Sequence, residues 1–195
     1  SPTAVELAPE LEQRPVTIEL RDVPFWRALE EVCAAAGGVR VEPGEQSVRI
    51  VPGPPAAVPR ALFDAFAVRL EGLYANEDIE LGTPDRRLTS AIKLRTCWEQ
   101  GTRPSRVRAQ IDALEEDTGR NLLEGLGDRP SAETLLQGPG VSEELSLNLI
   151  GVPSEGAARL ALRATVELDF VLRWAEIQFP APWTGTAECA EFGVR

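Results

Sequence analysis

The sequence predicts an α+β fold: a small βαββ domain followed by a larger antiparallel β-sandwich of the immunoglobulin-like kind. Three observations support this prediction. An amphipathic helical segment lies among strand-like segments near the N-terminus, a proline-rich stretch follows, and most segments beyond it alternate apolar and polar residues. Alternation with a period of two is typical of strands that bury one face. We therefore expect a βαββ domain over residues 1–53, a linker over 54–60 and a sandwich over 61–195.

The first domain is predicted from a strand, a helix and a hairpin. Residues 16–20 alternate as a half-buried strand does, and residues 4–7 are expected to form one further short strand. Asp-Val-Pro at 22–24 supplies an N-terminal cap and an early-turn proline, and Gly37 and Gly38 end the helix. The apolar residues of this helix recur at helical spacing: Phe25, Leu29, Val32, Cys33 and Ala36.

A β-hairpin is expected after the helix. Residues 39–41 and 47–51 alternate on either side of Pro-Gly-Glu-Gln at 43–46, which is a typical turn composition. The hairpin completes the predicted domain near Pro52.

Over residues 4–52 the sequence resembles the short N-terminal domain of secretins and TonB-dependent receptors. The matching pattern is a V-T-I-x-L strand, a V-P-F-W entry to the helix and an A-L pair inside it. The residues that fit it are Val16, Thr17, Ile18, Leu20, Val23, Pro24, Phe25, Trp26, Ala28 and Leu29. The resemblance implies a domain that lies outside the cytoplasm, in the periplasm, in the cell envelope or secreted, and that works by contacting other proteins.

The second domain is predicted from alternation. The linker is a Gly-Pro-Pro-Ala-Ala-Val-Pro run, which is too rich in proline for a helix or a central strand. The strand-like runs after it are 66–71, 88–98, 106–113, 145–149 and 160–172. Some six or seven antiparallel strands are expected in total. A turn is expected at 117–120, a long loop at 121–140 and a bulge or a tight bend near Arg173 and Trp174.

Composition excludes several classes of function. The formal net charge of −11 opposes binding to nucleic acid, and no apolar run is long enough to predict membrane insertion. The sequence has no histidine, so the commonest general base and the commonest zinc ligand are both absent, and neither an enzyme nor a cofactor is expected. The chain also has no methionine, so a start at Ser1 indicates a processed or truncated product.

Two features of the sequence have the residue types of a catalytic or a metal site. Ser90 and Lys93 have the S-x-x-K spacing of a serine nucleophile, but in a strand positions three apart point to opposite faces. Acidic clusters lie at 77–80, 115–117 and 143–144, without the spacing of a calcium loop, and are expected to be solvated turns. No catalytic residue and no metal ligand are therefore assigned.

The three cysteines allow at most one internal disulfide. Cys33 lies on the apolar side of the predicted helix and is expected to be a core residue. Cys97 and Cys189 either pair across the second domain or remain free thiols, because spacing alone does not fix their proximity.

Trp26 and Arg27 are the first candidates for a binding site. Trp26 flanks the apolar stripe of the helix, and tryptophan and arginine are enriched at protein interfaces. The alternative is that Trp26 is half-buried beneath the linker or the second domain. Exposed strand edges in either domain are further places where a partner strand can bind.

The sequence thus predicts a non-catalytic, extracytoplasmic protein-interaction or envelope-assembly module, and its partner is expected to be another protein. The alternative is a β-sandwich that recognises a carbohydrate or another small molecule on loops at one end. A third possibility is a structural spacer inside a longer polypeptide. The oligomeric state is not predicted.

Overall fold

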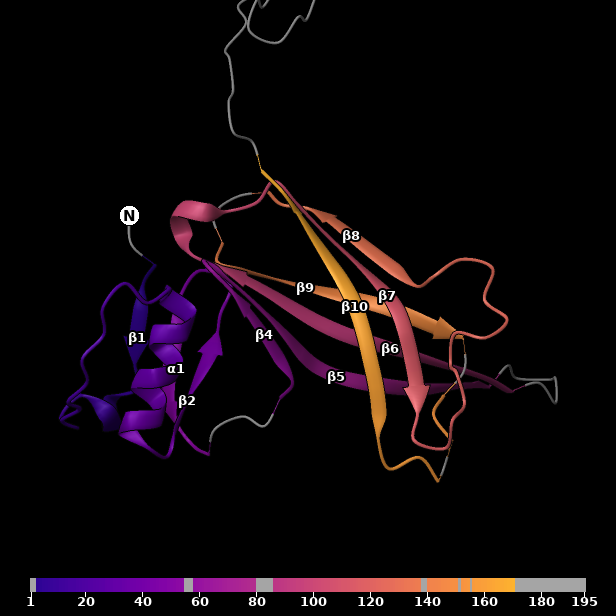
Figure 1. The fold of residues 1–195 in the computed structure, drawn as a ribbon, viewed down its shortest axis with the longest axis horizontal. Coiled ribbons are helices and arrows are strands. Elements are labelled where there is room, and N and C mark those ends of the chain that lie inside the picture. The colour runs from indigo at the N-terminus through magenta and orange to yellow at the C-terminus, as the bar shows by residue number, and fades with distance from the viewer. Residues whose placement is uncertain are drawn as a thin grey trace, which may run out of the picture.

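The computed structural model describes residues 3–54, 58–79, 86–137, 140–150, 152–154 and 156–170. Over these residues the fold is rich in strands, which form three sheets, with one α-helix and two short 3-10 helices. Figure 1 shows the N-terminal unit beside one end of the two longer sheets.

The N-terminal sheet has the strand order β1-β3-β2. Its elements are β1 (Val5–Leu7), α1 (Phe25–Ala36), β2 (Val39–Pro43) and β3 (Val48–Pro52). β1 runs parallel to β3, and β2 pairs with β3 in the opposite direction, so the predicted hairpin and the predicted short strand near residues 4–7 are confirmed.

The strand predicted at residues 16–20 is wrong. This segment has no regular secondary structure, and Val16 and Ile18 are 37% and 38% exposed. Alternation indicates which side chains a strand would bury but supplies no pairing partner, and both edges of β3 are already taken by β1 and β2.

The helix α1 spans the predicted residues, but its predicted cap is wrong. Pro24 precedes the first helical residue without a side-chain cap, and its carbonyl accepts a hydrogen bond of 2.9 Å from the Ala28 N–H. Asp22 has a φ of 52° and lies in a bend. At the other end Gly37, with a φ of 62°, donates its N–H to Cys33 and ends the helix as predicted.

Two longer antiparallel sheets follow. The first has the order β4-β5-β6-β9 and the second the order β10-β7-β8. The first contains β4 (Arg60–Phe63), β5 (Phe66–Ile79), β6 (Arg86–Trp98) and β9 (Ser142–Ile150). The second contains β7 (Arg106–Glu116), β8 (Ser131–Leu135) and β10 (Leu160–Asp169). The predicted strand runs and the turn at 117–120 are confirmed over the described residues, and the predicted bulge or bend near Arg173 lies outside them.

The long loop predicted at 121–140 is wrong in part, because it contains β8. This strand pairs with β7 through backbone hydrogen bonds, and three of its five residues are exposed. A short edge strand of this kind depends on the backbone of its neighbour, so its sequence carries little apolar alternation.

Two buried cores result from this arrangement. Side chains of both longer sheets enclose the larger core, which contains Trp98, Val107, Ile111, Leu114, Leu145 and Leu147 among others. The second core joins α1 and the N-terminal sheet to Ala67, Cys97 and Val141 of the second unit. Adjacent residues of β6 therefore serve different cores, Cys97 on the N-terminal side and Trp98 inside the sandwich. The two predicted domains share buried apolar contacts.

Candidate functional site

An apolar cleft of about 140 Å³ lies where the N-terminal unit meets β4 and β5. Its apolar walls come from α1, β2, β4 and β5: Trp26, Cys33, Ala34, Val39, Val41, Leu62 and Ala67. A cavity of this size is comparable with the engineered cavity of about 150 Å³ that binds benzene.

Charged side chains surround the mouth of this cleft. Glu30 of α1 forms an ion pair with Arg60 of β4. Arg69 of β5 donates from Nη1 to the Val41 carbonyl of β2, at 3.1 Å. Within the part of the chain that the structure describes, Arg69 has no carboxylate partner. The mouth thus contains a half-buried guanidinium whose charge is not neutralised by an ion pair.

A second cavity, of about 400 Å³, adjoins the cleft and is more polar. It shares Arg40, Val41 and Arg69 with the cleft and continues along β2 as far as Pro43. The other arginines of this region have acidic partners. Arg40 donates from Nε to Glu42 at 3.0 Å, and Arg95 donates to Glu71 and Glu144, each at 3.1 Å.

The free edge of β2 faces away from β3. Gly38 and Gly44 bond to Gly53 and Ser47 of the hairpin at 2.9 and 2.8 Å, and bonded pairs alternate along an antiparallel ladder. The backbone groups of Val39 and Val41 therefore point away from β3, which agrees with the contact between Val41 and Arg69. These two residues also line the cleft.

The opposite edge of the N-terminal sheet is β1, which pairs with β3 alone among the described strands. The side chains of Val5 and Leu7 are 41% and 51% exposed. The Ala4 carbonyl and the Ala8 N–H bond to β3, so the intervening backbone groups of Val5 and Leu7 point to the free side. This edge presents both unpaired backbone groups and exposed apolar side chains.

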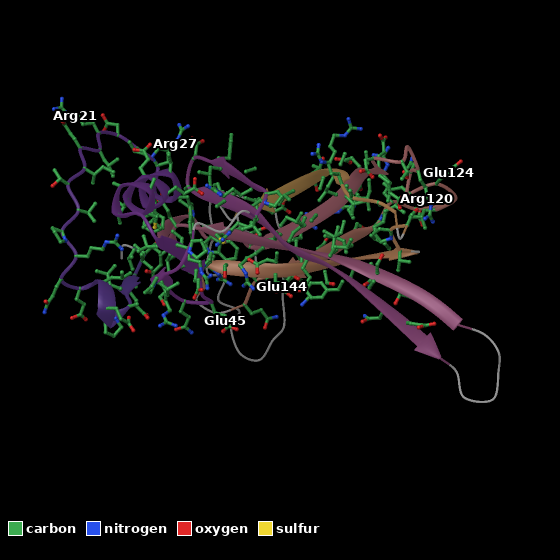
Figure 2. All side chains as sticks on the ribbon, turned by 90° about the horizontal axis from the view of Figure 1, so that it is seen from below. Arg21, Arg27, Glu45, Arg120, Glu124 and Glu144 are labelled. Atoms are coloured by element: carbon green, nitrogen blue, oxygen red, sulfur yellow. The ribbon has the colours of Figure 1, made fainter. Side chains whose placement is uncertain are left out.

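The two predicted site residues lie in different environments. Trp26 is 3% exposed, and its Nε1–H donates to the Ala65 carbonyl at 3.1 Å. The indole is therefore buried against the second unit, which agrees with the alternative role given for it, and it also lines the apolar cleft. Arg27 is exposed, and Figure 2 shows its side chain pointing outward from α1.

The S-x-x-K pair is separated by the strand, as alternation predicts. Ser90 is 3% exposed and lies two residues before Ile92, so in β6 it is on the same face as this residue of the larger core. Lys93 is on the other face, where it forms an ion pair of 2.9 Å with Glu144 and lies 4.9 Å from the Tyr74 ring centroid. Figure 2 shows Glu144 and Glu45 on the same side of the molecule.

Within the described residues, no group of three or more His, Cys, Asp or Glu residues is placed so that it could hold a metal ion, and part of the cluster at 77–80 lies outside those residues. Glu116 instead accepts hydrogen bonds from Ser154 and Thr118. Glu143 lies beside Glu144 in β9, where burial is the main cause that raises its pKa.

The described thiols are both buried and free. Cys33 is 8% exposed at the wall of the cleft, and burial, followed by the nearby charge of Glu30, raises its pKa. Burial raises the pKa of Cys97 to about 12. Its predicted alternative partner, Cys189, lies outside the described residues. Neither described thiol is a reactive thiolate.

Sequence reasoning missed Arg60 and Arg69 as site residues, because outward charges in alternating strands have the same pattern. The available signal was that Arg69 shares a strand face with Ala67, an unusually small residue at which another element can approach closely.

Comparison with models of protein families, with curated proteins and with solved structures found no match. No helix in the described ranges has the length and apolar character that crossing a bilayer requires.

Proposed function

We propose that this chain is a non-catalytic protein-interaction or envelope-assembly module that acts outside the cytoplasm. We further propose that a partner protein adds an extended strand to the β1 edge. The observation that carries this proposal is the exposure of Val5 and Leu7 on a strand whose outer backbone groups have no neighbouring strand among those described. Open edges of this kind are templates for pairing with another chain.

The exposed segment after β1 adds to the same argument. Val16 and Ile18 are partly exposed apolar residues in the same N-terminal unit, outside any regular element. Exposed apolar side chains that gather in one part of a protein are typical of interaction surfaces.

The proposed location rests on the resemblance to the short N-terminal domain of secretins and TonB-dependent receptors. An immunoglobulin-like topology remains our proposal for the second unit, supported by two antiparallel sheets around one core.

Site-specific photo-crosslinking in the organism that encodes the chain tests this proposal. A photoreactive amino acid is placed at Leu7, or at Val5, and a matched probe is placed at Glu167, which is exposed on β10. We expect one partner protein to be captured from both β1 positions and not from Glu167. Leu7→Lys should abolish capture from Val5, because the charge opposes burial of this edge.

Two outcomes contradict the proposal. Equal capture from β1 and from Glu167 indicates non-specific contact, and a product that contains only this chain identifies a second copy instead of a partner. The alternative function, carbohydrate recognition by the sandwich, is tested on a glycan array. Specific binding of a sugar, together with no partner at β1, would replace the proposed function.

A further inference from the structure

The two cavities along β2 have the form of a groove beside a strand edge. The apolar cleft borders Val39 and Val41, and the adjoining cavity continues past Glu42 to Pro43. The backbone groups of Val39 and Val41 point away from β3, but Val39 is 2% exposed and the Val41 carbonyl accepts from Arg69. The Val41 N–H is therefore the backbone group that this edge offers to an extended chain in the groove.

The cleft end of this groove suits one apolar side chain. Its volume of about 140 Å³ and its lining by Trp26, Leu62 and Ala67 match a group the size of a leucine or phenylalanine side chain. The ion pair between Glu30 and Arg60 crosses the mouth, but the two side chains are 31% and 40% exposed, so solvent screening keeps this barrier weak.

The charge beside the cleft suits one anionic group. Arg40 and Arg95 are paired with Glu42 and with Glu71 and Glu144, so their charges are neutralised. Arg69 donates to a neutral carbonyl and has no carboxylate partner in the described part of the chain. An arginine in this position can bind a carboxylate through two N–H groups.

We infer that the groove along β2 binds the C-terminal residue of a polypeptide, with its apolar side chain in the cleft and its free carboxylate on Arg69. The apolar cleft, the arginine that has no carboxylate partner among the described residues and the Val41 N–H on the outer edge of β2 together select an extended chain that ends in an apolar residue. This site lies on the opposite edge of the N-terminal sheet from β1, so it goes beyond the proposed function and can fail independently of it.

Binding of a labelled peptide to the full chain tests the inference. The probe is fluorescein-Gly-Ser-Gly-Ser-Val-Leu with a free C-terminal carboxylate, followed by fluorescence anisotropy. The same peptide with a C-terminal amide should bind at least about tenfold more weakly, since it loses a charge-assisted contact. A small acid with the leucine side chain, 4-methylpentanoate, should compete only weakly because it cannot pair with β2.

Matched variants locate the site. Arg69→Gln should weaken binding of the acid peptide by about tenfold or more, and Arg163→Gln, a charge-matched change on exposed β10, should leave it unchanged. Ala34→Trp fills the cleft from an exposed helix position and should abolish binding, whereas Ala35→Trp, also exposed but outside the lining, should not. Circular dichroism and melting curves confirm that each variant folds.

Four results overturn the inference. No binding at millimolar peptide removes the site, and equal binding of the amide removes recognition of the carboxylate. Competition by 4-methylpentanoate at the affinity of the peptide shows a small-acid site without strand pairing. Unchanged binding in a folded Ala34→Trp variant places the peptide elsewhere. None of these results bears on capture at β1.

Discussion

Glu116 ends β7 as a buried carboxylate held by three hydrogen bonds. It accepts from the Ser154 N–H at 2.8 Å, and from the Ser154 and Thr118 hydroxyls at 2.7 Å each. The residue is 4% exposed, and Arg120 lies 3.7 Å away. These bonds, first those from Ser154 and then that from Thr118, hold the pKa of Glu116 below its ordinary value. The carboxylate thereby fastens residues 152–154 to the end of β7.

Glu116→Gln should reduce both the stability of the protein and its sensitivity to acid. Because the folded-state pKa is lowered, the stabilising contribution is complete above the ordinary glutamate pKa, which is about 4.3, and is lost as pH falls through the folded-state value. We expect the melting temperature of the variant to be lower at pH 7 and to approach that of the wild type in acid. Thermal melting from pH 7 to pH 3 measures this.

The neighbouring residue provides the control for this prediction. Glu115 is exposed, and Glu115→Gln should leave the melting profile close to that of the wild type. An acid-dependent loss of stability that is identical in wild type and Glu116→Gln would show that the buried carboxylate has no part in it. The difference between the melting profiles of the wild type and of Glu116→Gln isolates the contribution of Glu116. Neither profile alone does so, because Asp112 also has a lowered pKa and is present in both proteins.

At the scale of elements, the sequence predicts the helix and strands that have an apolar period. It does not predict a strand that forms only because its backbone pairs with a neighbouring strand. The helix and the long strands β5, β6, β7, β9 and β10 are evident from their apolar periods. β8 has no such period because its backbone pairing with β7 forms it. Residues 16–20 have the period but no partner strand. The cleft depends on how β2 lies against β4 and β5, which no local pattern specifies.

Hydrogen exchange distinguishes these elements in solution. The amides of residues 16–20 are outside any sheet and should exchange within seconds, whereas those of β7, which is paired on both sides, should exchange at least about a thousandfold more slowly. Exchange followed by mass spectrometry of short peptides measures both. Protection at residues 16–20 equal to that of β7 would mean that the strand predicted from alternation does form in the free protein.

At the scale of the whole molecule, the N-terminal unit packs against the β4-β5-β6-β9 sheet, on the face that is turned away from the larger core. Trp26 bonds to the Ala65 carbonyl, and the Phe25 N–H bonds to the Glu99 side chain at 3.2 Å. Cys97 and Val141 lie in the same core as α1. The β2 groove is formed by this packing, so the proposed peptide site requires the two units to remain joined.

Trp26→Ala should expose Cys97 to thiol reagents. In the wild type Cys97 is fully buried, and its pKa of about 12 leaves little thiolate, so labelling has to wait for the two units to separate. Removing a buried tryptophan typically costs about 3–5 kcal/mol, which raises the population of opened molecules. We expect labelling of Cys97 by dithiobis(nitrobenzoate) to be at least about tenfold faster.

Mass spectrometry of the peptide that contains Cys97 separates it from Cys33, and Arg27→Ala, the adjacent exposed position, should label at the wild-type rate. Labelling of Cys97 at an unchanged rate in Trp26→Ala would show that this indole does not hold the two units together.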